Sequence, residues 1–159
     1  MKWGKIFKFL FCIILCQLAG GLGAVFTTPS IPTWYAGLVK PSFNPPNWIF
    51  APVWTTLYLM MAVSLFLIWN KGFSVTGAKR ALFLFGGQLV LNVLWSLVFF
   101  KLHSPLAGFI IIIILWVMIL STILSFNRIS RPASLFLIPY ILWVSFASVL
   151  NFFLWRLNV

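Results

Sequence analysis

The sequence of 159 residues contains no aspartate and no glutamate. This absence excludes a carboxylate acid/base pair, a carboxylate proton relay and a Ser-His-Asp triad. Calcium and magnesium sites are disfavoured as well, because both ions bind to anionic oxygen atoms. The chain also has only one histidine, His103, and two cysteines, Cys12 and Cys16. We predict no metal site and no resident cofactor, with His103 solvated or capping a helix and the two cysteines packed on one helix face.

Positive charge and apolar residues, in contrast, are abundant. Eleven lysines and arginines give a net charge of +11, 63% of the residues are hydrophobic, and the mean hydropathy is +1.12. These values exclude an ordinary soluble domain. A basic chain can bind nucleic acid, but here the cations stand in short clusters between apolar segments, which is typical of a membrane protein. We therefore expect membrane lipid as a partner and no nucleic acid.

Five stretches carry no charged residue, and a helix of about 20 residues crosses the hydrocarbon core of a bilayer. Because lipid offers no hydrogen bonds to the backbone, such spans must be helical. The first span is interpreted as a retained helix rather than a signal peptide, since no A-x-A cleavage pattern follows it. The sequence predicts an all-α membrane protein, a single domain over residues 1–159, with five transmembrane helices at about residues 5–26, 48–69, 80–100, 105–127 and 132–156.

The cations between the spans predict an orientation. If the N-terminus lies inside, most of the lysines and arginines fall on the cytoplasmic side, and only Lys40, Lys101 and Arg156 fall outside. Cytoplasmic loops of membrane proteins carry such an excess of positive charge. We therefore expect the N-terminus inside and the C-terminus outside, with the connector between the first two helices on the outer side.

That connector is rich in proline and tryptophan. Residues 34–58 read WYAGLVKPSFNPPNWIFAPVWTTLY and run from this outer loop into the second span. Proline lowers the entropy lost on ordering, and aromatic rings bring large contact area with few torsions. Such a loop is suited to cover something apolar as a rigid lid. The alternative is an anchor at the membrane surface, where Trp and Tyr collect in any case. Lys40 is either a partner for an anionic ligand group or a solvated loop charge.

Polar and aromatic residues recur at helical spacing within three spans. On each span they fall on one face, which an amide in hydrocarbon turns toward the bundle. In one interpretation these groups bond helix to helix; in the other, three faces converge on a ligand cavity. The faces comprise Ala51, Trp54, Tyr58 and Met61 on the second span, Gln88, Asn92, Trp95, Ser96 and Phe99 on the third, and Tyr140, Trp143, Ala147 and Asn151 on the fifth.

Proline and small residues modify two of the helices. Pro139 has no N–H to donate to the carbonyl of Leu135, so the fifth span is either kinked there or a plain bundle helix. On the first span, Ala19 with Gly23 and Gly20 with Ala24 form small pairs four residues apart. Such pairs permit close helix approach, either inside the bundle or across a homodimer.

Three segments together resemble the TspO/MBR family, whose members are called tryptophan-rich sensory proteins and translocator proteins, or peripheral-type benzodiazepine receptors. They are WYAGLVKPSFNPPNWIFAPVWTTLY, LNVLWSLVFF and PYILWVSFASVLNFFLWRLN, in order from Trp34 to Asn158. The resemblance implies a five-helix bundle with an aromatic cavity under the first connector. It also implies binding of porphyrins and other tetrapyrroles, sterols in some members, and benzodiazepine-site ligands, often in a dimer and in a bacterial cytoplasmic membrane.

The resemblance carries ligand contacts onto Trp34, Tyr35, Trp54, Asn92, Trp95, Trp143 and Ala147. Together with the helix faces, it gives ten candidate ligand-binding residues: Trp34, Tyr35, Trp54, Tyr58, Gln88, Asn92, Trp95, Trp143, Ala147 and Asn151. A sterol motif of animal members needs a tyrosine where this chain has Phe152, so sterol binding through that motif is not expected.

Three functions follow as hypotheses. The first is a membrane binding protein that senses, sequesters or transports porphyrins, tetrapyrroles and similar flat apolar ligands. Porphyrin or haem is a possible ligand, although a solvated or capping His103 is favoured over one that ligates haem. The second is an enzyme that degrades porphyrin oxidatively with Trp143 as the redox partner, since no acid/base set is available. The third is a structural membrane subunit without a ligand, in which protein side chains would fill the space between the aromatic faces.

Overall fold

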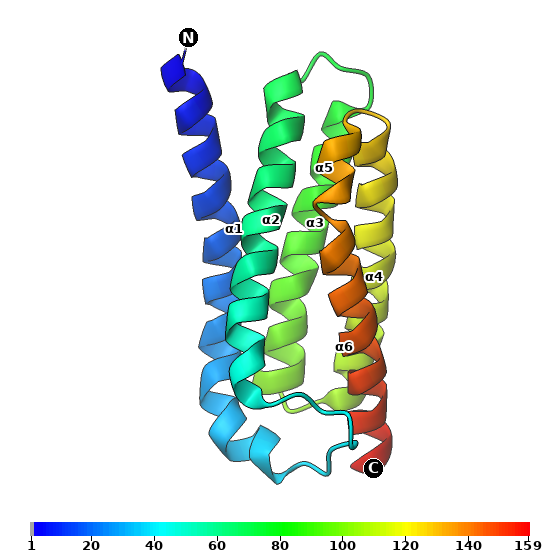
Figure 1. The fold of residues 1–159 in the computed structure, drawn as a ribbon. Helices are drawn as coiled ribbons and strands as arrows, with labels where there is room; N and C mark the ends of the chain where they lie inside the picture. The colour runs from blue at the N-terminus through cyan, green and yellow to red at the C-terminus, as the bar shows by residue number, and fades with distance from the viewer. Residues whose placement is uncertain (1) are drawn as a thin grey trace.

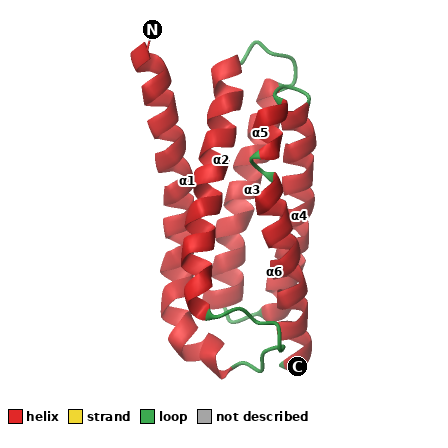
Figure 2. Ribbon diagram, viewed as in Figure 1, coloured by secondary structure: helices red, strands yellow, loops and turns green. Residues whose placement is uncertain are grey.

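The computed structural model describes the backbone of residues 2–159 and the side chains of residues 3–159. These residues form a bundle of helices with no strand (Figures 1 and 2). Five segments are long and apolar enough to cross a membrane, which confirms the predicted all-α membrane fold. The helices are α1 (Lys2–Ser30), α2 (Phe50–Lys71), α3 (Ala78–Ser96), α4 (Pro105–Asn127), α5 (Arg131–Leu135) and α6 (Ile138–Leu157).

The first helix runs further than its apolar stretch predicts. α1 passes Pro29 and continues in a π-helical turn, Ile31–Tyr35. The Thr33 hydroxyl donates to the carbonyl of Pro29 at 2.9 Å, so a side chain bonds to the backbone where the ordinary ladder changes. Trp34 and Tyr35 therefore lie on the end of a helix rather than in an extended loop. The irregular part of the connector is shorter, residues 38–46, and a short 3₁₀ turn, Asn47–Ile49, leads into α2.

The fifth span is not one continuous helix. It breaks at residues 136–137, so that α5 and α6 are separate segments with Pro139 in the first turn of α6. The missing N–H of Pro139 leaves the carbonyl of Leu135 without its usual helical partner. As a result, α5 packs against α2 and α4, whereas α6 packs against α4 and makes little contact with α2. The break thus separates α6 from α2 toward the connector end of the bundle.

The end of the bundle that holds the N-terminus is filled by direct side-chain packing. Phe85 on α3 stacks on Phe126 of α4 with ring centroids 5.7 Å apart. The Ser64 hydroxyl on α2 donates to the carbonyl of Ala133 on α5 at 2.7 Å. Cys12 and Cys16 on α1 are buried free thiols, as their shared helix face predicts. Side chains therefore pack directly between α2 and α5 and between α3 and α4 at this end of the bundle.

Candidate functional site: an aromatic cavity under the connector

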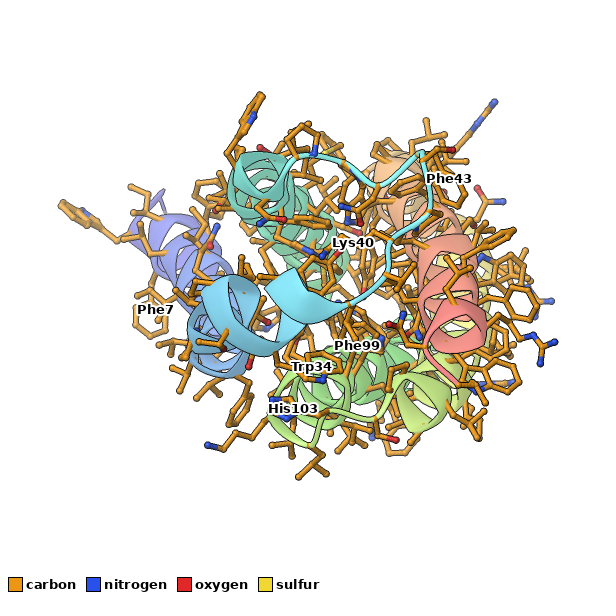
Figure 3. All side chains as sticks on the ribbon, turned by 90° about the horizontal axis from the view of Figure 1, so that it is seen from below. Phe7, Trp34, Lys40, Phe43, Phe99 and His103 are labelled. Carbon is orange, nitrogen blue, oxygen red and sulfur yellow. The ribbon has the colours of Figure 1, made fainter. Side chains whose placement is uncertain are left out.

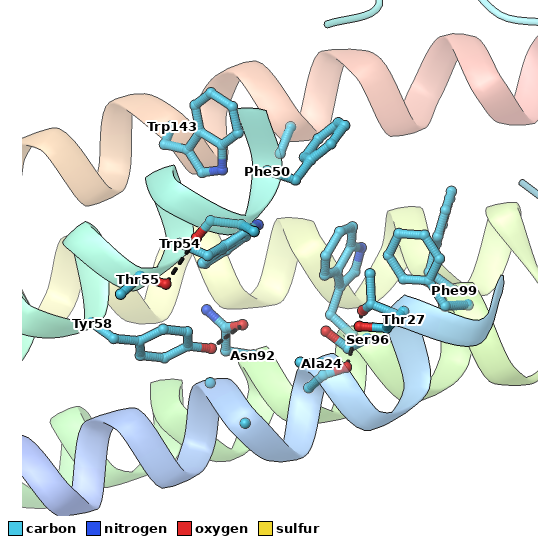
Figure 4. A pocket seen from close by; sticks show the side chains of 18 of the residues that line it. Ala24, Thr27, Phe50, Trp54, Thr55, Tyr58, Asn92, Ser96, Phe99 and Trp143 are labelled. Carbon is cyan, nitrogen blue, oxygen red and sulfur yellow. Dashed lines mark hydrogen bonds between the residues drawn. The ribbon is translucent and has the colours of Figure 1, made fainter. Parts of the chain in front are cut away.

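A cavity of about 330 Å³ lies between α1, α2, α3 and α6 at the connector end of the bundle (Figure 4). This volume is within the range of small-molecule pockets. The cavity exists because α6 diverges from α2 below the break in the fifth span. It is lined chiefly by aromatic and small residues, among them Gly20, Ala24, Thr27, Tyr35, Phe50, Trp54, Tyr58, Asn92, Trp95, Phe99, Trp143, Ala147 and Asn151.

Trp54 stands at the centre of the aromatic wall. Its ring lies 5.8 Å from Tyr58 on the same helix and 6.4 Å from Trp95 on α3. Trp95 in turn stacks on Phe99 with ring centroids 5.5 Å apart and an interplanar angle of 22°. Aromatic pairs at these separations attract each other beyond the burial of their surface. The wall therefore presents several ring faces in fixed positions to anything that enters the cavity.

A chain of buried hydrogen bonds closes the inner end of the cavity. The Tyr58 hydroxyl donates to Asn92 Oδ1 at 3.0 Å, and Asn92 Nδ2 donates to the Tyr140 hydroxyl at 2.8 Å. The Tyr140 hydroxyl donates to Gln88 Oε1 at 2.8 Å. All four side chains are buried, so each hydrogen bond satisfies a polar group for which lipid offers no partner. The chain ties α2, α3 and α6 together beneath the cavity.

A second pair of hydrogen-bonded side chains joins the cavity walls formed by α3 and α6. Trp95 Nε1 donates to Asn151 Oδ1 at 3.0 Å, and Asn151 Nδ2 donates to the carbonyl of Pro105 at 2.8 Å. Both side chains of this pair line the cavity, and their hydrogen-bonding groups are already used. They orient the walls and leave little polarity for a ligand.

Trp143 differs from the other polar groups of the wall. Its Nε1 atom is buried and has no hydrogen-bond partner within the described residues, although the side chain lines the cavity. The ring is held from the side by Phe50, at 6.2 Å, and by Phe146, at 5.4 Å. An unpaired buried donor costs about 1–3 kcal/mol. A ligand with an acceptor atom at this point would remove that cost.

The connector covers the end of the bundle that holds the C-terminus and is fastened at three places (Figures 1 and 3). The Val39 amide donates to Asn158 Oδ1 and Asn158 Nδ2 donates back to the Val39 carbonyl, both at 2.9 Å. The Tyr35 hydroxyl donates to Asn44 Oδ1 at 2.7 Å. The ring of Phe43 packs edge-on against Phe153 of α6 at 5.4 Å. The Val39–Asn158 hydrogen bonds and the Phe43–Phe153 contact join the connector to the C-terminal end of α6, and the Tyr35–Asn44 bond ties it to the π-helical turn.

Lys40 takes part in the connector's own structure. Its Nζ atom donates to the carbonyls of Ala36 and Leu38 at 3.0 and 3.1 Å and lies 5.0 Å from the centroid of the Tyr35 ring. The connector therefore resembles the predicted rigid lid in being pinned by prolines, aromatic contacts and hydrogen bonds. One wall of the cavity stays open, where Gly21 and Ala24 of α1 and Thr55 of α2 are exposed lining residues.

Eight of the ten candidate residues line the cavity together: Tyr35, Trp54, Tyr58, Asn92, Trp95, Trp143, Ala147 and Asn151. Gln88 lies behind the wall, bonded to Tyr140. Trp34 points the other way and stacks on His103 with ring centroids 4.6 Å apart (Figure 3). His103 is thus exposed against an indole ring, with a left-handed backbone (φ 53°).

None of the ten candidate residues lies on α1, although this helix forms part of the cavity wall. Gln17, Gly20, Gly21, Gly23, Ala24, Thr27 and Thr28 all line it. The small pairs on this helix were the available signal, since they predict close approach of another element. A Cβ atom at Gly20 would lie 2.6 Å from Cδ2 of Tyr58, so glycine is what allows α1 to meet the ring. Gly20 therefore makes an internal contact with α2, and Gly23 faces Ser96 of α3.

The cavity has aromatic walls and few free polar groups, and it contains no carboxylate because the sequence has none. Fold and site together define a multi-pass integral membrane protein with an internal aromatic cavity.

Comparison with known proteins identifies the family. A sequence model of the TspO/MBR family matches residues 12–156. The chain is 46% identical to the tryptophan-rich protein TspO of Chlorobaculum tepidum, over 97% of this chain and 98% of that protein. It is 35% identical to protein CrtK of Rhodobacter capsulatus (91% and 89%) and 37% identical to the translocator protein of Bos taurus (91% and 86%). The chain belongs to the TspO/MBR family, as the resemblance of its three segments predicts.

Proposed function

We propose that this protein binds porphyrins and similar flat apolar tetrapyrroles in the cavity, and that binding serves sensing, sequestration or transport in the membrane. The observation that carries the proposal is the unpaired Nε1 of Trp143 on an aromatic wall. A tetrapyrrole offers both an extended ring for the indole faces and acceptor atoms for that donor. Relatives named tryptophan-rich protein and translocator protein are consistent with a ligand that enters a membrane protein.

The geometry indicates how such a ligand would lie. Its ring would stack on Trp54 and Trp95, whose planes differ by 34°, and each aromatic contact would contribute about 0.5–1.5 kcal/mol beyond burial. An acceptor at the ring or its carboxylate side group would meet Trp143 Nε1. The open wall between α1 and α2 would admit the ligand and let anionic side groups reach water or lipid headgroups. A chain with net charge +11 favours anionic groups at its edges.

The hollow also bears on the ligand-free alternative. A purely structural subunit needs side chains to fill the space between its aromatic faces, yet about 330 Å³ stays empty here. The proposal further includes a bacterial cytoplasmic membrane with the N-terminus inside and the C-terminus outside, since most cations then face the cytoplasm. A homodimer is part of the same proposal, with the exposed apolar residues of α1 as one available surface.

A titration with protoporphyrin IX tests the binding site. The absorbance of the porphyrin itself is followed, so that the signal does not depend on which tryptophans remain. For a double variant, Trp54→Phe with Trp143→Phe, we expect affinity to fall at least tenfold, because a stacking face and the free donor are lost together. The matched control is Trp3→Phe with Trp48→Phe, two exposed tryptophans outside the cavity, which should bind as the natural protein does. Equal affinity in the two double variants would contradict the proposal.

A further inference from the structure

A second hollow lies on the outside of the bundle, near the N-terminus. It is a groove of about 250 Å³ between α1, α2 and α3, and its lining side chains are all apolar. Phe11 and Leu15 of α1 form one wall, Trp69 lies at its base, and Leu82 and Gly86 of α3 form the other wall. Figure 1 shows the first turns of α1 leaning away from α2. No residue from 3 to 159 fills it, and in a membrane it faces lipid.

Gly86 makes the groove accessible along α3. A Cβ atom built there meets no heavy atom within 4 Å, and the residue is exposed. Phe11 and Trp69 meet edge to face at 5.4 Å, so the aromatic base of the groove is fixed in place. A shallow apolar channel of this kind matches the cross-section of a hydrocarbon chain rather than a polar segment.

One cation, Lys8, borders the groove at the end where a headgroup would lie, and a second, Lys79, lies on the same face of α3 as two lining residues. Lys8 Nζ stands 5.6 Å from the ring centroid of Trp69, and Lys8 is half-buried among exposed neighbours. On α3, Lys79 precedes Leu82 by three residues and Gly86 by seven, which places all three on one helix face. Lys5 and Arg80 belong to the same helix ends, but the helical period turns Lys5 about 60° away from Lys8 and Arg80 about 100° away from Lys79.

These cations have no acidic side chain to pair with, because the sequence contains neither aspartate nor glutamate. An anion from outside the chain must therefore compensate them. We propose that the groove binds an anionic phospholipid, with one acyl chain between α1 and α3 and the phosphate group between Lys8 and Lys79. A second copy of the protein fits less well, because a symmetric contact at this face would bring like charges together.

Quenching of Trp69 by brominated lipid tests the site. The protein is placed in phosphatidylcholine bilayers that contain a small fraction of phosphatidylglycerol with brominated acyl chains, and its fluorescence is compared with that of the Trp69→Phe variant. The difference isolates Trp69. We expect stronger quenching by brominated phosphatidylglycerol than by the same fraction of brominated phosphatidylcholine, with about fivefold weaker apparent affinity for each lysine removed.

Two pairs of variants separate a built site from general attraction. Lys8→Gln with Lys79→Gln should lower quenching to the phosphatidylcholine level, whereas Lys5→Gln with Arg80→Gln removes the same charge from the same helix ends and should keep most of it. Gly86→Leu should obstruct the groove and displace the acyl chain without a clash, while Leu124→Phe, on an exposed face of α4, adds bulk elsewhere.

Thermal unfolding of each variant in detergent shows that the fold is kept. Equal quenching by the two lipids, or equal losses in the two charge variants, would overturn the proposal and leave an unspecific lipid shell. Unchanged quenching in Gly86→Leu would overturn the placement of the acyl chain.

Discussion

The two ends of the bundle use the same helices in different ways. Near the N-terminus, α2 meets α5, and Ser64 bonds directly to the backbone of Ala133. Toward the connector, α2 faces α6 across a hollow lined by Trp54 and Trp143. Composition does not separate the two ends, since both are rich in aromatic and small residues. The break at residues 136–137 does, because it redirects the last span away from α2 and leaves space that side chains do not fill.

Polar side chains at the boundary of the cavity also differ from those within it. At the inner boundary of the cavity, the Tyr58 and Tyr140 hydroxyls and the Asn92 amide are paired with one another. Within the cavity, Trp143 Nε1 is buried and unpaired. Gln88 Nε2, at the end of the hydrogen-bonded chain, is also buried without a partner among the described residues, but Gln88 lies behind the cavity wall. Of these two unpaired donors only Trp143 Nε1 belongs to a residue that lines the cavity, so it is the one that a bound ligand would reach.

The largest difference in stability is expected when an alanine is replaced by phenylalanine at each end of the bundle. Ala147→Phe places a ring in the hollow, so stability should change by less than about 1 kcal/mol while porphyrin affinity falls by at least a hundredfold. Ala62→Phe places the same ring where the side chain is 0% exposed, and we expect a loss of about 3 kcal/mol or failure to fold. Unfolding in mixed micelles and porphyrin titration measure the two effects. Similar stability losses in both variants would show that the cavity end is as tightly packed as the other.

A smaller difference in stability is expected between two glycine substitutions in the cavity wall. A Cβ atom at Gly20 would stand 2.6 Å from the Tyr58 ring, whereas one at Gly21 meets nothing within 4 Å. Gly20→Ala should therefore cost about 1–3 kcal/mol, because the ring is held by its bond to Asn92 and cannot move freely.

Gly21→Ala is the matched control for this contrast. It makes the same chemical change one residue along the helix and should stay within about 0.5 kcal/mol of the natural protein. Unfolding in mixed micelles measures both. If the two alanine variants were equally stable, the contact between α1 and Tyr58 would not exist as described.

The sequence predicts much of this arrangement and fails at identifiable places. Apolar runs locate the spans, and the helical period correctly puts Asn92 with Trp95 and Trp143 with Asn151 on faces that meet at the cavity. Periodicity fixes the face of a residue but not its depth. Gln88 shares the face of Asn92 yet lies one turn beyond it, where Tyr140 closes the wall.

Trp34 shows a second way in which the prediction of cavity residues from the sequence fails. It sits in a π-helical turn, which rotates the residues that follow relative to an ordinary helix. Tyr35 consequently lines the cavity, and Trp34 stacks on His103. The small pairs of α1 predict that another element approaches this helix closely, but they do not predict that its glycines line the cavity, because that depends on the position of Tyr58. Such features depend on which helices are neighbours, and no local pattern encodes that.

The smallest effect on global stability is expected at the connector, which covers the cavity end of the bundle. Asn158 holds Val39 with two hydrogen bonds of 2.9 Å and also donates to the carbonyl of Leu154 at 2.8 Å. Asn158→Ala removes all of them at an exposed site, so the loss of global stability should be about 1 kcal/mol or less. The connector itself should respond more, because its fastening to α6 depends on this residue.

Amide hydrogen exchange at Val39 measures that local effect, with protection expected to fall about tenfold in Asn158→Ala. Asn158→Asp keeps the acceptor for the Val39 amide and removes the amide donor, and should retain part of the protection. Exchange on α4, far from the connector, should be the same in both variants. If exchange at Val39 stayed unchanged, the prolines and Phe43 alone would hold the connector, and the lid would be rigid through its own chain rather than through its contact with the C-terminal turn.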